Sequence, residues 1–151
     1  MHDCATFLDL LIARFKDGTA KTAFTFLDQG RRDDVSYARL GADAQAMAGR
    51  IQRQAQPGDR VLIVLPPGRD YVTALLACAL AGMVAVPAVS PSSAKGLPRL
   101  ALIAEDAGAT LLLTTAALAA RIDAAETPLG GVPRLQVAID SQGAGEWAPP
   151  D

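Results

Sequence analysis

The side chains best suited to nucleophilic or metal chemistry are few and far apart. The chain of 151 residues has two cysteines, Cys4 and Cys78, and a single histidine, His2. A zinc site needs several such ligands close together, and a cysteine nucleophile needs a histidine beside it. Cys78 lies in the apolar segment 74–80, where a free thiol behaves as a small core residue. We therefore expect neither a metal site nor thiol catalysis, and the two thiols fit a reducing compartment.

Sequence patterns that bind phosphate or activate a serine are missing. The chain has no GxxxxGK[ST] loop, no GxGxxG after a predicted strand and no GxSxG turn. The link Pro66-Pro67-Gly68-Arg69-Asp70 follows a predicted core strand, at the edge where α/β sheets bind ligands. Its two prolines lack backbone N–H groups, which makes it a poor phosphate cradle. It is either a ligand-facing edge or a simple strand-to-helix turn, and the turn is favoured.

The remaining polar residues have structural interpretations. Glu105 and Asp106 are adjacent on a predicted helix and point to different faces, so they are expected on the surface rather than as a carboxylate pair. Asp59 and Arg60 predict a local ion pair in a turn. Trp147, in an aperiodic tail, either docks on the body or marks the edge of a domain contact. No residue is assigned a catalytic, cofactor-binding or metal-binding role.

Local patterns predict the elements that would position such groups. In the N-terminal third they are a helix over 7–16, a β-hairpin over 22–36 with its turn at 28–30, and a helix over 37–54. Thr6 and Ser36 are expected to cap the two helices, Gly18 to end the first, and Tyr37 to pack as an anchor. The charged quartet Arg31-Arg32-Asp33-Asp34 is expected as a solvated turn.

From Arg60 onward strands and helices alternate. The expected strands are 60–65, 83–86, 110–113 and 135–139; the expected helices are 69–81, 97–107 and 116–125, with a Ser/Pro/Gly loop over 90–96 and a turn over 127–133. Continuous apolar strands suit a parallel sheet covered on both faces. Pro87 is expected to stop the second strand. The fold class is therefore α/β, with the N-terminal helix and hairpin beside a largely parallel sheet joined by right-handed crossovers.

Composition excludes several kinds of protein. Hydrophobic residues make up 50% of the chain and charged residues 20%, which indicates a globular domain. The net charge of −2 gives no reason to expect nucleic acid as a partner. The start, Met1 to Cys4, lacks the features of a secretion signal, and the long apolar segment 71–89 is broken by Gly82 and Pro87. We expect a cytoplasmic chain without a membrane span.

Three segments, in this order, resemble motifs of adenylate-forming enzymes. Val35 to Leu40 is similar to their (T/S)YxxL motif, Pro57 to Val61 to their GDRV segment, and Leu80 to Pro87 to their AGxxxVP motif. Further segments resemble the fatty acyl-AMP ligase branch; they are 23–27 with Gly30, 64–68, 87–98, 99–107, 113–115 and the tail 146–150. The likeness covers nearly the whole chain.

The resemblance implies the two-step chemistry of the whole enzyme. ATP and a fatty acid form an acyl-adenylate and pyrophosphate with Mg²⁺, and the acyl group passes to the pantetheine thiol of an acyl carrier protein, often in polyketide or nonribosomal biosynthesis. In the family a phosphate loop, an aromatic adenine pocket, acidic residues and a C-terminal lysine do this work, and none of them maps onto residues 1–151. The resemblance thus implies an N-terminal α/β subdomain over 1–139, a linker over 140–151 toward the phosphate loop, and no activity or tight ATP binding by this part alone.

Other interpretations stay open. Within the same superfamily the chain is alternatively part of an acyl-CoA synthetase or of an amino-acid adenylation domain. A non-catalytic interaction module is a different class, and a small nucleotide-binding α/β protein is disfavoured by the missing phosphate loop. A piece of a larger sheet exposes strand edges and apolar surface, so we expect the isolated chain to self-associate.

Overall fold

The computed structural model describes residues 6–17, 20–28, 30–125, 127–137 and 147–149. Its elements, in chain order, are α1 (Phe7–Asp17), β1 (Thr22–Asp28), β2 (Arg31–Ser36), α2 (Tyr37–Gln52), β3 (Arg60–Val64), α3 (Arg69–Leu80), β4 (Val84–Pro87), the 3₁₀ turn η1 (Ala94–Gly96), α4 (Leu97–Ala107), β5 (Ala109–Thr114), α5 (Ala116–Ala124), the 3₁₀ turn η2 (Pro128–Gly131) and β6 (Arg134–Gln136). The α/β class and the order of elements are as predicted.

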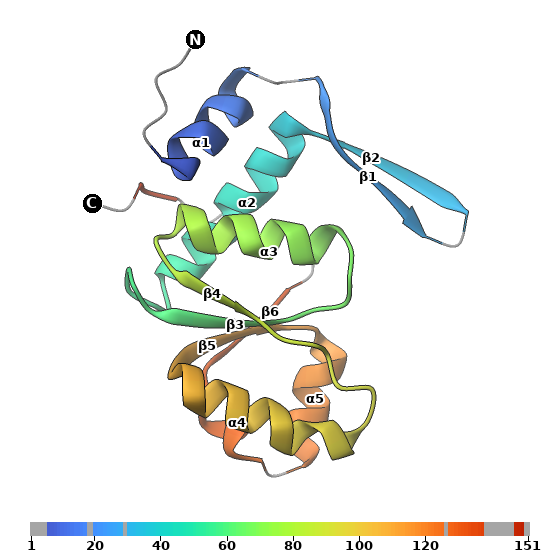
Figure 1. The fold of residues 1–151 in the computed structure, drawn as a ribbon, viewed down its shortest axis with the longest axis vertical. Helices are drawn as coiled ribbons and strands as arrows, with labels where there is room; N and C mark the ends of the chain where they lie inside the picture. The colour runs from blue at the N-terminus through green and yellow to red at the C-terminus, as the bar shows by residue number, and fades with distance from the viewer. Residues whose placement is uncertain (1–5, 18–19, 29, 126, 138–146, 150–151) are drawn as a thin grey trace.

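The main sheet is parallel and covered on both faces. Its four strands lie in the order β4-β3-β5-β6, and every neighbouring pair is parallel. Helices α2 and α3 lie on one face and α4 and α5 on the other, while α1 and the antiparallel β1–β2 hairpin form a further layer beyond α2 (Figure 1). The chain leaves β3 for β4 on one side and returns to β5 on the other, so the strand order reverses at β3.

Alternation along the central strands divides the core into two clusters. Val61, Ile63 and Leu65 face α2 and α3, whereas Leu62 and Val64 face α4 and α5. The central leucines of β5 alternate between the two faces in the same way. Because both faces are covered, the strands are continuous apolar runs, which is the pattern from which a parallel sheet was predicted.

The N-terminal layer follows its local signals. The Thr6 hydroxyl accepts a hydrogen bond from the backbone N–H of Asp9 at 3.1 Å, and the Ser36 hydroxyl accepts one from that of Arg39 at 3.2 Å, so both predicted caps are confirmed. Phe15, the buried residue of α1, packs on Gly41 of α2. A Cβ at Gly41 would lie 2.6 Å from the Phe15 ring, so the close approach of α1 to α2 requires glycine there.

Long-range hydrogen bonds from three side chains define the amino-terminal edge of the sheet. The Arg60 guanidinium donates to the carbonyls of Ala107 and Gly108, each at 2.9 Å, where α4 ends in a left-handed glycine. The Trp147 indole N–H donates to the carbonyl of Leu80 at 2.9 Å, at the end of α3. Gln52 holds the same short segment through both of its side-chain groups, its Nε2 lying 2.8 Å from the carbonyl of Ala148. Trp147 therefore docks on the body.

Several details of the sequence predictions are wrong. The quartet from Arg31 to Asp34 is exposed, but it forms strand β2 rather than a turn. Asp59 and Arg60 form no local ion pair among the described residues: Asp59 accepts from the N–H of Gln56, and Arg60 reaches across to α4. In contrast, strand β4 ends at Pro87 as predicted, with the proline as its last residue opposite Ile63, on a sheet edge that needs no donor from it.

Boundaries differ slightly elsewhere. Helix α2 ends at Gln52 instead of 54, and short 3₁₀ turns occupy parts of the predicted loop 90–96 and turn 127–133. Strand β6 spans Arg134–Gln136, and the last two residues of the predicted strand 135–139 lie outside the described residues. Gly18 and most of the predicted linker 140–151 lie outside the described residues. In the part of the chain that the structure describes, no helix is long and apolar enough to cross a membrane.

Candidate functional site

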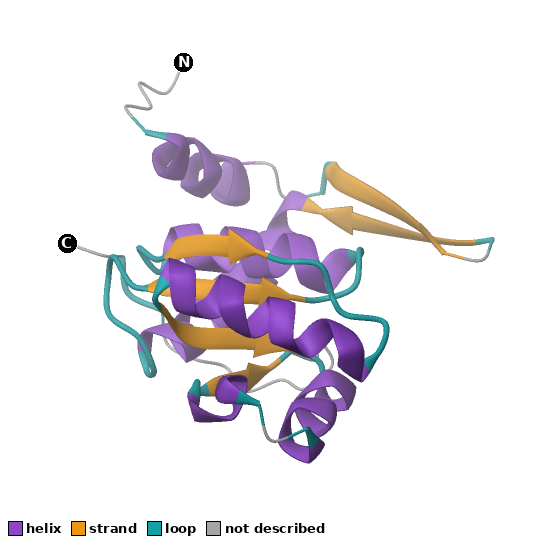
Figure 2. Cartoon of the chain, turned by 60° about the horizontal axis from the view of Figure 1, so that its bottom comes forward, coloured by secondary structure: helices purple, strands orange, loops and turns teal. Residues whose placement is uncertain are grey.

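The carboxyl ends of the parallel strands form the edge where this type of sheet binds ligands. Strand β3 exits toward α3 on one face, and β5 exits toward α5 on the other, so the edge is open between them. The sheet arrows point toward the side to which the hairpin projects (Figure 2). Any ligand that uses the ordinary site of this architecture therefore approaches from the hairpin side.

An apolar hollow of about 430 Å³ lies on this edge, between the exits of β3 and β4. Pro66 and Pro67 line it on one side and the segment 87–90 on the other, with Leu65 and Tyr71 completing its wall. None of these side chains is charged, and the prolines offer no backbone donor. The hollow is suited to apolar groups and poorly suited to phosphate.

The candidate link 66–70 is both a turn and a wall of this hollow. Gly68 opens α3 at φ +152°, without a side-chain cap. Arg69 and Asp70, which were part of the same candidate, belong to the first turn of α3 and do not line the hollow. The proline half of the candidate thus contributes surface at the edge, whereas Arg69 makes a different contact.

Arg69 is part of an ion-pair cluster near the carboxyl edge of the sheet. The Arg69 Nη2 pairs with a carboxylate oxygen of Asp43 on α2, and its Nη1 lies 3.8 Å from Asp33 on β2. Arg39 on the same helix contributes a second contact to Asp43, with its Nε 3.1 Å from Oδ1. One guanidinium therefore ties the hairpin to α2 and α3. The spacing of Arg39 and Asp43, four residues apart on a helix, is a sequence signal for their ion pair. No local signal indicates that Arg69 contacts Asp43 and Asp33.

The titratable groups of the described residues fit structural roles. Burial raises the pKa of the Cys78 thiol to about 12, so it stays protonated and is a poor nucleophile at neutral pH. The hydrogen bond from Arg32, and then that from Thr25, lower the pKa of Asp34 on the exposed face of the hairpin. Glu105 and Asp106 are exposed on α4, as expected. No three His, Cys, Asp or Glu side chains gather as a metal site in the described ranges.

A buried hydroxyl lies at the same carboxyl edge. Thr114 ends β5, opposite Val64, and is fully buried. Its Oγ1 has no hydrogen-bond partner among the described residues, although its backbone carbonyl accepts from Val137. Unpaired buried polar atoms are uncommon in folded proteins. Neither Thr114 nor the hollow has a local sequence signal, so neither was predicted from the sequence.

A comparison with known protein families matches most of the chain. The family of AMP-binding enzymes matches residues 13–150, which is most of the chain. The chain belongs to the AMP-binding enzyme family. The family match includes the hairpin, the sheet and the Trp147 segment.

Individual relatives indicate which branch of the family the chain resembles. The medium-chain-fatty-acid–[acyl-carrier-protein] ligase JamA of Moorena producens is 36% identical over 115 residues, covering 73% of this chain and 19% of that protein. The long-chain-fatty-acid–AMP ligase FadD32 of Mycolicibacterium smegmatis is 34% identical over 141 residues, covering 87% of this chain and 22% of that protein. The resemblance to fatty acyl-AMP ligases is thereby confirmed, and the chain spans about a fifth of the length of these relatives.

Solved structures agree with the sequence relatives. The fatty acid AMP ligase of Legionella pneumophila superposes with a TM-score of 0.85 at 28% identity, covering 99% of this chain and 26% of that one. The same similarity holds for the ligase of that organism in complex with acyl adenylate and pyrophosphate. The McyG A-PCP structure, at 21% identity and a TM-score of 0.82, shares the fold. The fold is that of the N-terminal domain of adenylate-forming enzymes.

Proposed function

We propose that this chain is the N-terminal part of a fatty acyl-AMP ligase that loads an acyl carrier protein. In the first step a fatty-acid carboxylate attacks the α-phosphorus of ATP and pyrophosphate leaves. In the second step a pantetheine thiol attacks the acyl-adenylate carbonyl and AMP leaves. The proposal is supported chiefly by the 99% coverage of this chain in its superposition on the Legionella pneumophila ligase, with a carrier-protein ligase among the sequence relatives.

The residues of this chain do not supply the ATP site in this proposal. The sequence has no Gly-rich phosphate loop, the hollow at the carboxyl edge lacks charge, and the described residues hold no carboxylate cluster fit for Mg²⁺. We assign ATP and Mg²⁺ binding to chain beyond residue 151. Residues 1–151 then act as a scaffold whose apolar carboxyl edge faces the site, and they are inactive by themselves.

The direct test is product analysis on the polypeptide of the complete open reading frame. It is incubated with ATP, Mg²⁺ and fatty acids of graded length, and acyl-adenylate is detected by mass spectrometry. Residues 1–151 alone are the matched control, and we expect acyl-adenylate only from the complete polypeptide. Absence of acyl-adenylate with every fatty acid from a folded complete polypeptide would refute the proposal.

The acceptor is tested in the same reaction mixture. A phosphopantetheinylated carrier protein and free coenzyme A are offered at equal concentration, and we expect the acyl group on the carrier protein. Transfer to coenzyme A instead would identify an acyl-CoA synthetase, and adenylation of amino acids but not fatty acids would identify an amino-acid adenylation domain.

A further inference from the structure

The outer face of helix α4 carries an exposed leucine between opposite charges. Three buried apolar residues attach the helix to the sheet, namely Leu97, Leu100 and Ala104. On the opposite side of the helix, Leu102 is 65% exposed. Arg99 precedes this leucine by three residues, and Glu105 and Asp106 follow it by three and four, so the helical repeat places all four on one side. One end of this face is therefore basic, its centre apolar and its other end acidic.

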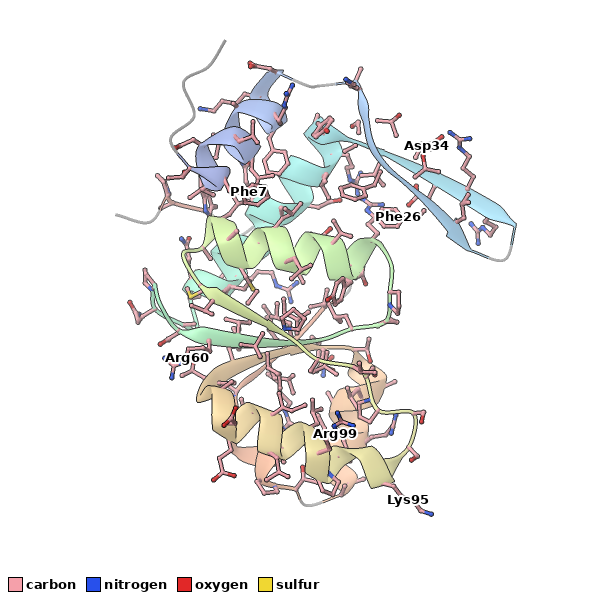
Figure 3. The ribbon with its side chains drawn as sticks, viewed as in Figure 1. Phe7, Phe26, Asp34, Arg60, Lys95 and Arg99 are labelled. Atoms are coloured by element: carbon pink, nitrogen blue, oxygen red, sulfur yellow. The ribbon has the colours of Figure 1, made fainter. Side chains whose placement is uncertain are left out.

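This face is turned away from most of the molecule. Helix α4 lies on the side of the sheet opposite α2, α3 and the N-terminal layer (Figure 1). Lys95 projects from the body just before α4 begins, which adds a second cation to the basic end (Figure 3). An open hollow of about 610 Å³ runs along the face and is lined by Leu102, Ile103 and the three charged residues of α4. The hollow leaves room beside Leu102 for a side chain of another molecule.

The charges of this face lie against the dipole of their own helix. Arg99 is in the first turn of α4, whereas Glu105 and Asp106 are in its last turn. A helix is stabilised by the reverse arrangement, with acidic groups at its start and basic groups at its end. None of the three side chains forms an ion pair with another residue that the structure describes. The stability of α4 therefore does not explain the arrangement, which suits a neighbouring helix of opposite direction.

A second copy of α4 is a neighbour with the required charges. When two copies pack antiparallel about a two-fold axis at Leu102, the two leucines meet at the axis. Arg99 of each copy then lies level with Glu105 of the other, and Asp106 is about 1.5 Å further along the helix. A two-fold contact uses the same patch on both molecules, so the patch must be complementary to itself. The face of α4 meets this condition, which a surface for a different protein need not meet.

We propose that the outer face of α4 is a two-fold contact between two copies of this protein. The contact joins Leu102 to Leu102 and the basic end of each helix to the acidic end of the other. One helix face is smaller than the roughly 800 Å² per partner of a standard interface, so the association is weak. The inference does not depend on the proposed function, because it involves no step of the ligase reaction.

Charge reversal on the polypeptide of the complete open reading frame tests the contact. Arg99→Glu makes the whole face acidic, and the double variant Glu105→Lys/Asp106→Lys makes it basic. Sedimentation equilibrium from about 10 to 500 µM, the range expected for a small interface, measures the dimer dissociation constant. We expect this constant to rise at least tenfold in each variant, because like charges then face each other at both ends of the contact.

A mixture of the two variants is the decisive measurement. The acidic face of Arg99→Glu complements the basic face of the double variant at both ends, so the two should form a heterodimer as strong as the unsubstituted dimer. Arg53→Glu is the matched control, since it changes the net charge equally but at the exposed end of α2, on the other side of the sheet. We expect the double variant to bind Arg99→Glu at least tenfold more tightly than it binds Arg53→Glu.

Three results would overturn the inference. The first is an unsubstituted polypeptide that stays monomeric over the whole concentration range, which would also be the result if later chain covers α4. The second is an Arg99→Glu variant that dimerises as strongly as Arg53→Glu. The third is equal binding of the double variant to Arg99→Glu and Arg53→Glu, which would reduce the association to a general attraction between net charges. All the substituted side chains are exposed, so circular dichroism should show the same fold in every variant.

Discussion

Replacing Arg60 with methionine should destabilise the fold through contacts made across the sheet. The guanidinium donates to two carbonyls at the end of α4, each at 2.9 Å, and it is part-buried. Hydrogen bonds from a charged donor contribute about 1.5–3 kcal/mol each when they are well shielded. Since this group is partly exposed, we expect Arg60→Met to lower the free energy of unfolding by about 2 kcal/mol in total, or roughly 4–8 °C in Tm for a chain of this size.

The assay is urea unfolding followed by circular dichroism, with Asp59→Asn as the matched control. Asp59 accepts from the N–H of Gln56 at 2.9 Å, and an asparagine oxygen can accept in its place. The control should therefore lose no more than about 0.5 kcal/mol, and the double variant should show additive losses. A loss below about 0.5 kcal/mol for Arg60→Met, or strong coupling between the two sites, would refute the cross-sheet contact and restore the local ion pair.

Three more predictions concern the same core and its edge. Gly108→Ala should destabilise the fold by about 1 kcal/mol or more, because φ is +59° and the new Cβ would lie 2.6 Å from the Arg60 Nη2. Thermal unfolding measures the loss, and an unchanged Tm would contradict the prediction. Burial raises the pKa of the Cys78 thiol from 9.0 to about 12, so folding favours the neutral thiol. The stabilisation from this group is therefore complete below pH 9 and is lost as pH rises toward 12. In urea titrations at each pH, the free energy of unfolding should decline less over this range in Cys78→Ala than in the unsubstituted chain. Trp147 is the single tryptophan, so its fluorescence reports docking directly: Gln52→Ala should red-shift the emission and raise acrylamide quenching, and an unaltered spectrum would show that Gln52 does not hold the segment.

The order of elements was predictable because local chemistry encodes it. The hydroxyls of Thr6 and Ser36 cap the helices that follow them in sequence, and apolar runs such as 60–65 are recognisable as doubly covered strands. The hairpin followed from alternation in 22–27, although the charged half of its second strand looked like a turn. Charged residues are poor strand formers in general, and here they are tolerated because that part of the strand is exposed.

What the sequence could not predict depends on contacts between distant segments. The partner of Arg60 is 47 residues away, and the contact that Trp147 makes with Leu80 spans 67 residues. The apolar hollow arises only when the exits of β3 and β4 come side by side in the parallel sheet. The family motifs could be read from local residues, whereas the hollow and the contacts of Arg60 and Trp147 required the assembled fold.

The gene sequence beyond the codon for Asp151 distinguishes the N-terminal part of a ligase from an interaction module. We predict an uninterrupted frame several times longer than the present chain, with a Ser/Thr/Gly-rich loop that carries a lysine soon after the Trp147 segment. A stop codon directly after Asp151 would contradict the proposed ligase function, since this polypeptide would then lack a phosphate-binding loop and an interaction module would become the better explanation of the fold.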